Sequence, residues 1–142
     1  GPLFRERETV EAAAARSTRT VRLVDSPISV CDLMLEADIA VSAAGQTLYE
    51  LAVTGTPTVA VKVADNQSGN FRSFAERGTV LPVTFNTADQ VRESLSEALR
   101  RLLSEYDLRS RMSEAGQRLV DGKGARRCAE ALLDANAVPY DA

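Results

Sequence analysis

Short apolar runs alternate along the chain with longer segments in which apolar residues are spaced further apart. The runs at residues 39–43, 57–63 and 79–83 are rich in β-branched and small residues, as buried strands are. A further strand is predicted over residues 20–25, "TVRLVD", because an Asp-Ser-Pro turn follows it. Pro82 indicates that the last run lies near a sheet edge.

The intervening segments place apolar residues at helical spacing. The predicted helices cover residues 5–16, 29–38, 47–55 and 65–78, and three more follow, opening at "TADQ" (87–90), at Asp107 and after "DGKG" (121–124). Gly55 stands where a glycine commonly ends a helix. Strands that alternate with helices predict an α/β fold with a Rossmann-like parallel sheet and helices on both faces. Such sheets bind ligands at the carboxyl ends of their strands.

The stretch "VSAAGQTLYE" (41–50) joins a predicted strand to a predicted helix through small residues. A helix N-terminus carries unpaired N–H groups and a partial positive charge, so a phosphate can bind there when the preceding backbone is slim. Close packing of a strand against a helix also demands small residues. Both interpretations of this loop stay open on the residues alone.

Glu50 also has two interpretations. Thr47 and Glu50 fit the capping box S/T-x-x-E, in which the glutamate only closes its own helix. Alternatively, the carboxylate accepts two hydrogen bonds from the paired hydroxyls of a ribose. The spacing is the same in both cases.

The composition narrows the function classes. The 142 residues suffice for one domain, and the net charge of −3 argues against nucleic acid as a partner. No apolar run is long enough for a membrane span and no signal peptide is visible, so we expect a cytoplasmic protein. The chain has no histidine, so neither a metal nor another cofactor is predicted. Its two cysteines, Cys31 and Cys128, are predicted to be buried thiols rather than a disulfide.

The block "ADIAVSAAGQTLYELAVTGTPTVAVKVADNQSGNF", followed by "FAERG", resembles the C-terminal half of GT-B fold nucleotide-sugar enzymes. The shared pattern is Ala-Asp, an apolar run, a small-residue loop, T-x-x-E, then G-x-P, a strand and Asn-Gln before a helix. "ADNQ" (64–67) is similar to a detail of the PseG family, the UDP-sugar hydrolases of pseudaminic acid biosynthesis. SpsG proteins and MurG-type glycosyltransferases resemble it more distantly. The resemblance covers about residues 20–133.

This resemblance implies a set of substrate-binding residues but no catalytic one. They are Ile28, Ala44, Gly45, Gln46, Thr47, Glu50, Asn66 and Gln67. The backbone of 44–46 and the Thr47 hydroxyl would hold a diphosphate, Glu50 the ribose, and the turn near Ile28 would face the uracil. Asn66 and Gln67 would bind the sugar or its phosphate, although a helix cap in a solvated turn explains them equally well.

The resemblance also implies missing parts. The family's N-terminal domain carries the catalytic histidine, and its C-terminal domain opens with strands that have no counterpart before residue 5. We therefore expect residues 1–142 to be one partial GT-B C-terminal domain lacking its first strands, with Gly1-Pro2 a cloning scar. It would bind a UDP-sugar but be inactive alone; the alternative is a non-catalytic binding or assembly module. Its expected partner is the missing domain, or a second copy at the open sheet edge.

Overall fold

The computed structural model describes residues 6–85 and 87–136, and by its internal contacts the chain divides into two units, Gly1–Val30 and Cys31–Ala142. The first unit contains helix α1 (Arg7–Ala15). Arg7 on α1 donates a hydrogen bond to Asp25 at the far end of the unit. This bond and the guanidinium charge lower the pKa of the Asp25 carboxyl below its usual value.

The strand predicted over residues 20–25 is wrong. These residues carry no regular secondary structure, and Val21, Leu23 and Val24 are each about half exposed, at 47%, 48% and 47%. A strand is stable only beside another strand, and the described part of the first unit has a helix but no second strand. The β-branched pattern was present, but the partner that it needs was not.

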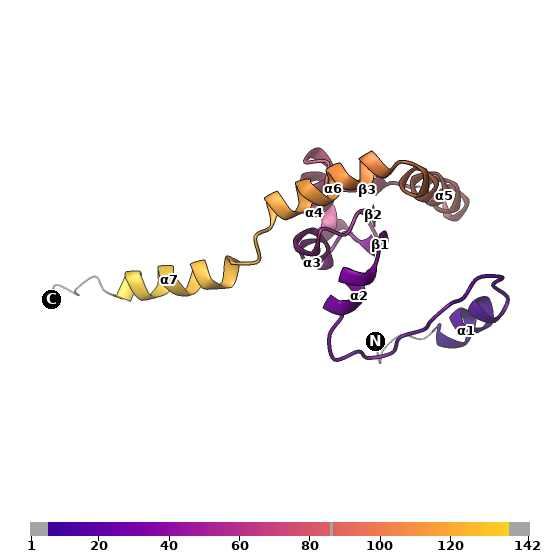
Figure 1. Cartoon of the computed structure of the whole chain (residues 1–142), viewed down its shortest axis with the longest axis horizontal. Coiled ribbons are helices and arrows are strands. Elements are labelled where there is room, and N and C mark those ends of the chain that lie inside the picture. The colour runs from indigo at the N-terminus through magenta and orange to yellow at the C-terminus, as the bar shows by residue number, and fades with distance from the viewer. Residues whose placement is uncertain (1–5, 86, 137–142) are drawn as a thin grey trace. The chain divides into compact units, whose positions relative to one another are not determined.

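The second unit is built on a parallel sheet with the strand order β1 (Ala40–Ala43), β2 (Thr58–Val61) and β3 (Val80–Val83). Figure 1 shows these strands between the helices of the unit. Val41 lies beside Val59, and Val59 beside Leu81. The predicted parallel α/β fold is therefore confirmed.

Each face of the sheet packs against its own helices. Helices α3 (Thr47–Thr54) and α4 (Ser68–Glu76) cover one face, where the buried cluster consists of Ala44, Leu48, Ala52, Ala60, Phe74 and Val80. Helices α5 (Ala88–Ser104) and α6 (Tyr106–Leu119) cover the other, where the cluster consists of Val59, Val83, Ala98, Leu102 and Met112. Because successive strand residues point to opposite faces, the neighbours Val59 and Ala60 belong to different clusters.

The remaining elements connect or extend this core. Helix α2 (Cys31–Glu36) buries Met34, whose carbonyl oxygen accepts a hydrogen bond of 2.8 Å from the Thr56 hydroxyl. A 3₁₀ turn, η1 (Asp65–Gln67), precedes α4. Helix α7 (Gly124–Asn136) follows the "DGKG" break as predicted. No helix in residues 6–85 and 87–136 has the length and apolar character needed to cross a membrane.

Several local predictions are confirmed. Gly55 ends α3 with a left-handed backbone (φ 74°), and Pro82 lies on an edge strand. The Thr87 side chain accepts a hydrogen bond of 3.3 Å from the Gln90 N–H, which caps α5. The prediction of buried cysteines is wrong: both are exposed thiols, because Cys31 opens α2 and Cys128 lies on α7, where every described side chain is exposed.

Candidate functional site

The slim loop of the sequence lies where the structure turns from β1 into α3. Ala44 is completely buried, and its N–H donates to the Val61 carbonyl oxygen at 3.0 Å, continuing the sheet by one bond. Three residues later the helix begins at Thr47. The two alanines and Gly45 let the backbone reverse direction at the carboxyl end of β1 without a side chain standing over the turn.

This turn leaves three consecutive N–H groups available. The first hydrogen bonds of α3 run from Leu48 N to Gly45 O (3.3 Å) and from Tyr49 N to Gln46 O (2.9 Å). The N–H groups of residues 45–47 precede them and have no partner among the described residues. Successive unpaired N–H groups at the positive end of a helix form a concavity that suits an anion.

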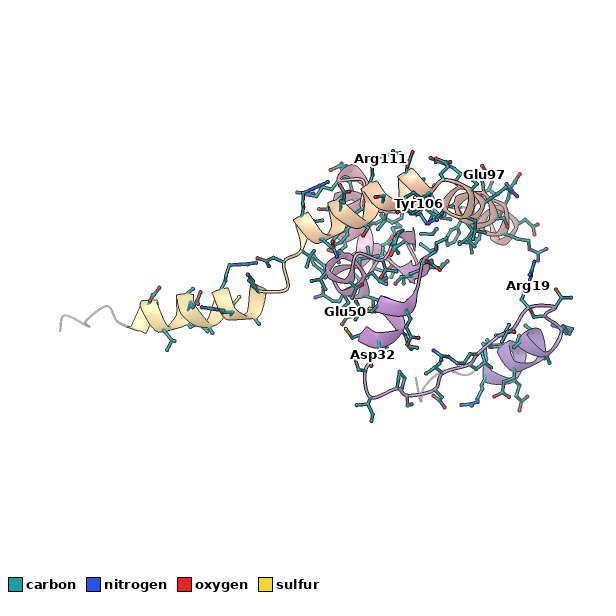
Figure 2. The ribbon with its side chains drawn as sticks, in the orientation of Figure 1. Arg19, Asp32, Glu50, Glu97, Tyr106 and Arg111 are labelled. Atoms are coloured by element: carbon teal, nitrogen blue, oxygen red, sulfur yellow. The ribbon has the colours of Figure 1, made fainter. Side chains whose placement is uncertain are left out.

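Glu50 lies one turn into α3 and is exposed (Figure 2). The capping interpretation requires Thr47 to precede the helix, but the residue at the cap is Gln46, which already has a helical backbone (φ −62°, ψ −29°). The Glu50 carboxylate makes no hydrogen bond to a described residue. The capping box is therefore not formed, and the carboxylate is available to a ligand.

The second loop predicted to bind ligand comes close to the first. Gln67 accepts a hydrogen bond from the Val63 N–H at 3.0 Å through its Oε1 atom. This bond holds its Nε2 atom near Gly45, at 3.9 Å from the place where a Gly45 Cβ would stand. Gln67 occupies the cap position of α4, but its side chain makes no capping bond there. Asn66 is exposed beside it.

Sequence reasoning missed a link between the two loops. The Tyr49 hydroxyl lies 3.2 Å from Asn70 Oδ1, and its ring meets the edge of Phe74 with centroids 4.9 Å apart. These contacts tie the first turn of α3 to α4. Only the helical spacing of Tyr49 could have drawn attention to it, and the partner on another helix could not be identified from that spacing.

Ile28, the remaining predicted site residue, belongs to the first unit, where its side chain is fully exposed. Its role beside the uracil stays a prediction. Among the described residues, no group of three or more histidine, cysteine, aspartate or glutamate side chains is placed to hold a metal ion.

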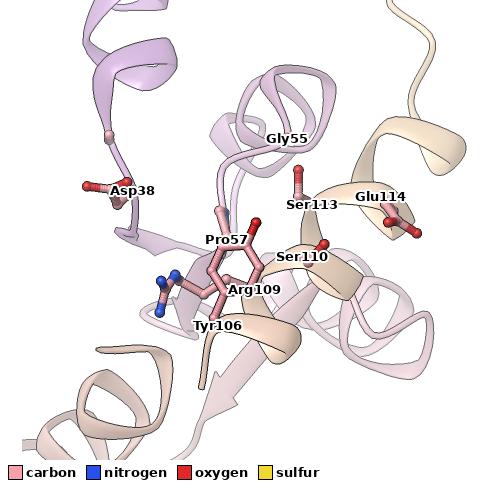
Figure 3. A pocket seen from close by; sticks show the side chains of 9 residues that line it. Asp38, Gly55, Pro57, Tyr106, Arg109, Ser110, Ser113 and Glu114 are labelled. Atoms are coloured by element: carbon pink, nitrogen blue, oxygen red, sulfur yellow. The ribbon is translucent and has the colours of Figure 1, made fainter. Parts of the chain in front are cut away.

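A hollow of about 300 Å³ lies at the opposite end of the strands, between the residues that precede β1 and β2 and the start of α6 (Figure 3). Asp38, Pro57 and Ser113 are among its lining residues. Its charged member Arg109 is already engaged, because it donates to the Leu102 carbonyl oxygen at 2.5 Å and lies over the Tyr106 ring at 5.5 Å. The hollow therefore belongs to the packing of α5 and α6, away from the slim loop.

Known proteins resemble this chain over much of its length. It is 30% identical over 113 residues, 80% of this chain, to the spore coat polysaccharide biosynthesis protein SpsG of Bacillus subtilis. It is 36% identical over 70 residues, 49% of this chain, to a Helicobacter pylori protein named pseudaminic acid cytidylyltransferase and UDP-2,4-diacetamido-2,4,6-trideoxy-beta-L-altropyranose hydrolase. No family model matches the chain.

A third relative is a transferase. The chain is 34% identical over 107 residues, 72% of its length, to the Gloeobacter violaceus UDP-N-acetylglucosamine–N-acetylmuramyl-(pentapeptide) pyrophosphoryl-undecaprenol N-acetylglucosamine transferase. The aligned regions span 33%, 14% and 29% of the three relatives, in the order given. The chain thus corresponds to a third or less of each of these proteins, and its predicted resemblance to SpsG-like, PseG-like and MurG-like sequences is confirmed.

Proposed function

We propose that this chain is the nucleotide-sugar-binding part of a UDP-sugar hydrolase or glycosyltransferase. The observation that carries the proposal is the row of N–H groups at residues 45–47, which have no partner among the described residues and lie at the carboxyl end of β1. Two of the relatives are named for reactions of UDP-linked sugars, which supports a diphosphate as the anion bound there.

The proposed diphosphate subsite uses the backbone first. The N–H groups of Gly45, Gln46 and Thr47 donate to phosphate oxygens, and the exposed Thr47 hydroxyl adds a fourth donor. Ala44 contributes its small side chain rather than its N–H, which the sheet already uses. The partial positive charge at the start of α3 favours the phosphates electrostatically.

The flanking side chains would read the rest of the ligand. Glu50 follows the phosphate-binding turn on the same helix, so its carboxylate accepts hydrogen bonds from the two ribose hydroxyls. The Gln67 amide, held near Gly45 by its bond to Val63, donates to the sugar or its phosphate together with Asn66. Ile28 would cover the uracil.

We expect the chain to bind without catalysing a reaction on its own. It contains no histidine, and nothing in the proposed subsite activates a water molecule or an acceptor hydroxyl. Purified chain incubated with UDP-N-acetylglucosamine should release UDP no faster than buffer does. Enzyme-dependent UDP release that scales with protein concentration would contradict this expectation.

Isothermal titration calorimetry tests the binding itself. We expect UDP and UDP-N-acetylglucosamine to bind, GDP and dTDP to bind more weakly, and uridine without phosphates to bind weakest. Inorganic pyrophosphate serves as the probe for the N–H groups alone. The proposal is wrong if none of the nucleotides binds, or if uridine binds as tightly as UDP, since the diphosphate would then contribute nothing.

A further inference from the structure

The two edges of the three-stranded sheet differ in whether another strand can join them. Successive residues of a strand turn their N–H and C=O groups to opposite sides. In β1, Ala40 N donates to Pro57 O at 2.9 Å and Ala44 N to Val61 O at 3.0 Å, so these residues face β2. Val41 and Ala43 therefore present their N–H and C=O groups to the outer side of β1.

The β1 edge also lacks the features that normally keep an edge strand from pairing. Residues 39–43 contain neither a charge nor a proline. Val41 is 49% exposed, whereas its neighbour Val59 in the central strand is completely buried. The Ser42 hydroxyl donates to the Ala43 carbonyl oxygen at 3.0 Å, but that oxygen can accept a second bond.

The β3 edge is closed by Pro82. In β2, Pro57 O and Val61 O are turned to β1, so Ala60 between them is turned to β3. Ala60 is in register with Pro82, and in a parallel ladder its bonds run to the residues on either side of that partner. Pro82 therefore faces outward, where it has no N–H to offer to a further strand.

We propose that two copies of this chain associate through β1 and form one continuous sheet from two three-stranded halves. An antiparallel arrangement with Ser42 at the two-fold axis sets Val41 opposite Ala43 of the partner subunit. Each of the two such pairs then exchanges two backbone hydrogen bonds. Because Pro82 blocks the other edge of each copy, the assembly ends at a dimer and does not grow into a filament. This association does not depend on nucleotide binding.

Sedimentation velocity and amide hydrogen exchange of the 142-residue chain, over a wide range of concentration, test the proposal. We expect a monomer–dimer equilibrium in which the Val41 and Ala43 amides exchange more slowly as the dimer forms. Three results would overturn it: a monomer at every concentration, protection of these amides without association, as residues 20–25 of the same chain would give, or growth beyond two copies.

Proline substitutions locate the interface. Val41→Pro and Ala43→Pro each remove one outward donor, so they should weaken dimerisation at least tenfold without removing a bond to β2. Ser42→Pro is the matched control, because it removes an inward donor and should lower the melting temperature instead. If the first two variants fail to fold, Ala43→Lys brings two positive charges together near the axis and should also separate the copies. A dimer that survives all folded variants refutes the proposed interface.

The opposite change tests the closure. Pro82→Val restores a donor to the outer side of β3 and should convert the dimer into larger assemblies. If Pro82→Val remains a dimer, the proline is not what limits the assembly.

Discussion

The two ends of α3 use their polar groups in opposite ways. At its start, the N–H groups of residues 45–47 have no partner among the described residues, and the side chains of Thr47 and Glu50 are exposed. At its end, the Gly55 N–H donates to Ala52 O at 3.1 Å, and the buried Thr56 hydroxyl donates to Met34 O at 2.8 Å. One end is satisfied by the protein, and the other is satisfied only when something binds.

Glycine shows the same contrast. A Cβ at Gly55 would stand 2.7 Å from Ser113 Oγ and 2.8 Å from Gln117 Nε2, and the backbone there is left-handed. A Cβ at Gly45 would meet only Gln67 Nε2, at an ordinary 3.9 Å. The fold needs Gly55, whereas the protein itself does not need Gly45. The comparison teaches that the small residue at the start of α3 is explained by a ligand better than by packing.

The largest effect is expected from Glu50→Gln, which breaks the ligand-binding end. An amide oxygen accepts from one ribose hydroxyl, and its NH₂ group opposes the other. Losing a charged hydrogen bond of this kind is worth about 1.5–3 kcal/mol, or roughly ten- to hundredfold in UDP affinity. The melting temperature without ligand should not change, because Glu50 forms no capping bond.

Calorimetry and thermal melts of Glu50→Gln decide this, with Glu93→Gln as the matched control on the exposed side of α5. A lower melting temperature with unchanged UDP affinity would restore the capping interpretation and remove Glu50 from the proposed site.

Alanine in place of each glycine should separate the two ends. Gly55→Ala is expected to cost about 1–2 kcal/mol in the free energy of unfolding, because an L-residue is strained in the left-handed region. Gly45→Ala should leave unfolding unchanged and weaken UDP binding about tenfold, close to 1.4 kcal/mol, because its methyl group stands where the phosphate approaches.

Chemical denaturation and calorimetry on both glycine variants measure these effects. The contrast between the ends fails if Gly45→Ala destabilises the protein as much as Gly55→Ala does.

The smallest effects are expected from valine at the two threonines. Thr56→Val removes the bond to Met34 O and should lower the free energy of unfolding by about 1 kcal/mol. Thr47→Val removes only an exposed hydroxyl, so it should spare stability and weaken UDP binding several-fold, again about 1 kcal/mol. The same two measurements apply, and equal loss of stability in both variants would show that the start of α3 is also structural.

Much of this arrangement could be predicted because it depends on local chemistry. Apolar runs located all three strands, Gly55 marked the end of α3, and Pro82 marked an edge strand. The slim loop and Glu50 were placed correctly at the carboxyl end of β1 because strand-to-helix turns there follow from the order of the elements. Whether they bind a UDP-sugar stays a proposal.

The failures concern partners that are distant in the sequence. Residues 20–25 have the composition of a strand, but composition does not supply a neighbouring strand. The cysteines were expected inside because cysteine is usually buried, yet Cys128 lies on a helix whose described side chains are all exposed. Gln67 was singled out, but its bond to Val63 and its approach to Gly45 arise only from the fold.

The exposure of α7 has a consequence for handling the protein. A protease must open a segment of backbone before it can cut, and a helix that buries none of its described side chains opens at little energetic cost. Lys123, Arg126 and Arg127 follow one another at the start of this helix, so brief digestion with trypsin should cut there first. The same digestion should spare the peptide bonds within β2, where three of the four side chains are fully buried, and so yield a shortened chain that still contains the sheet.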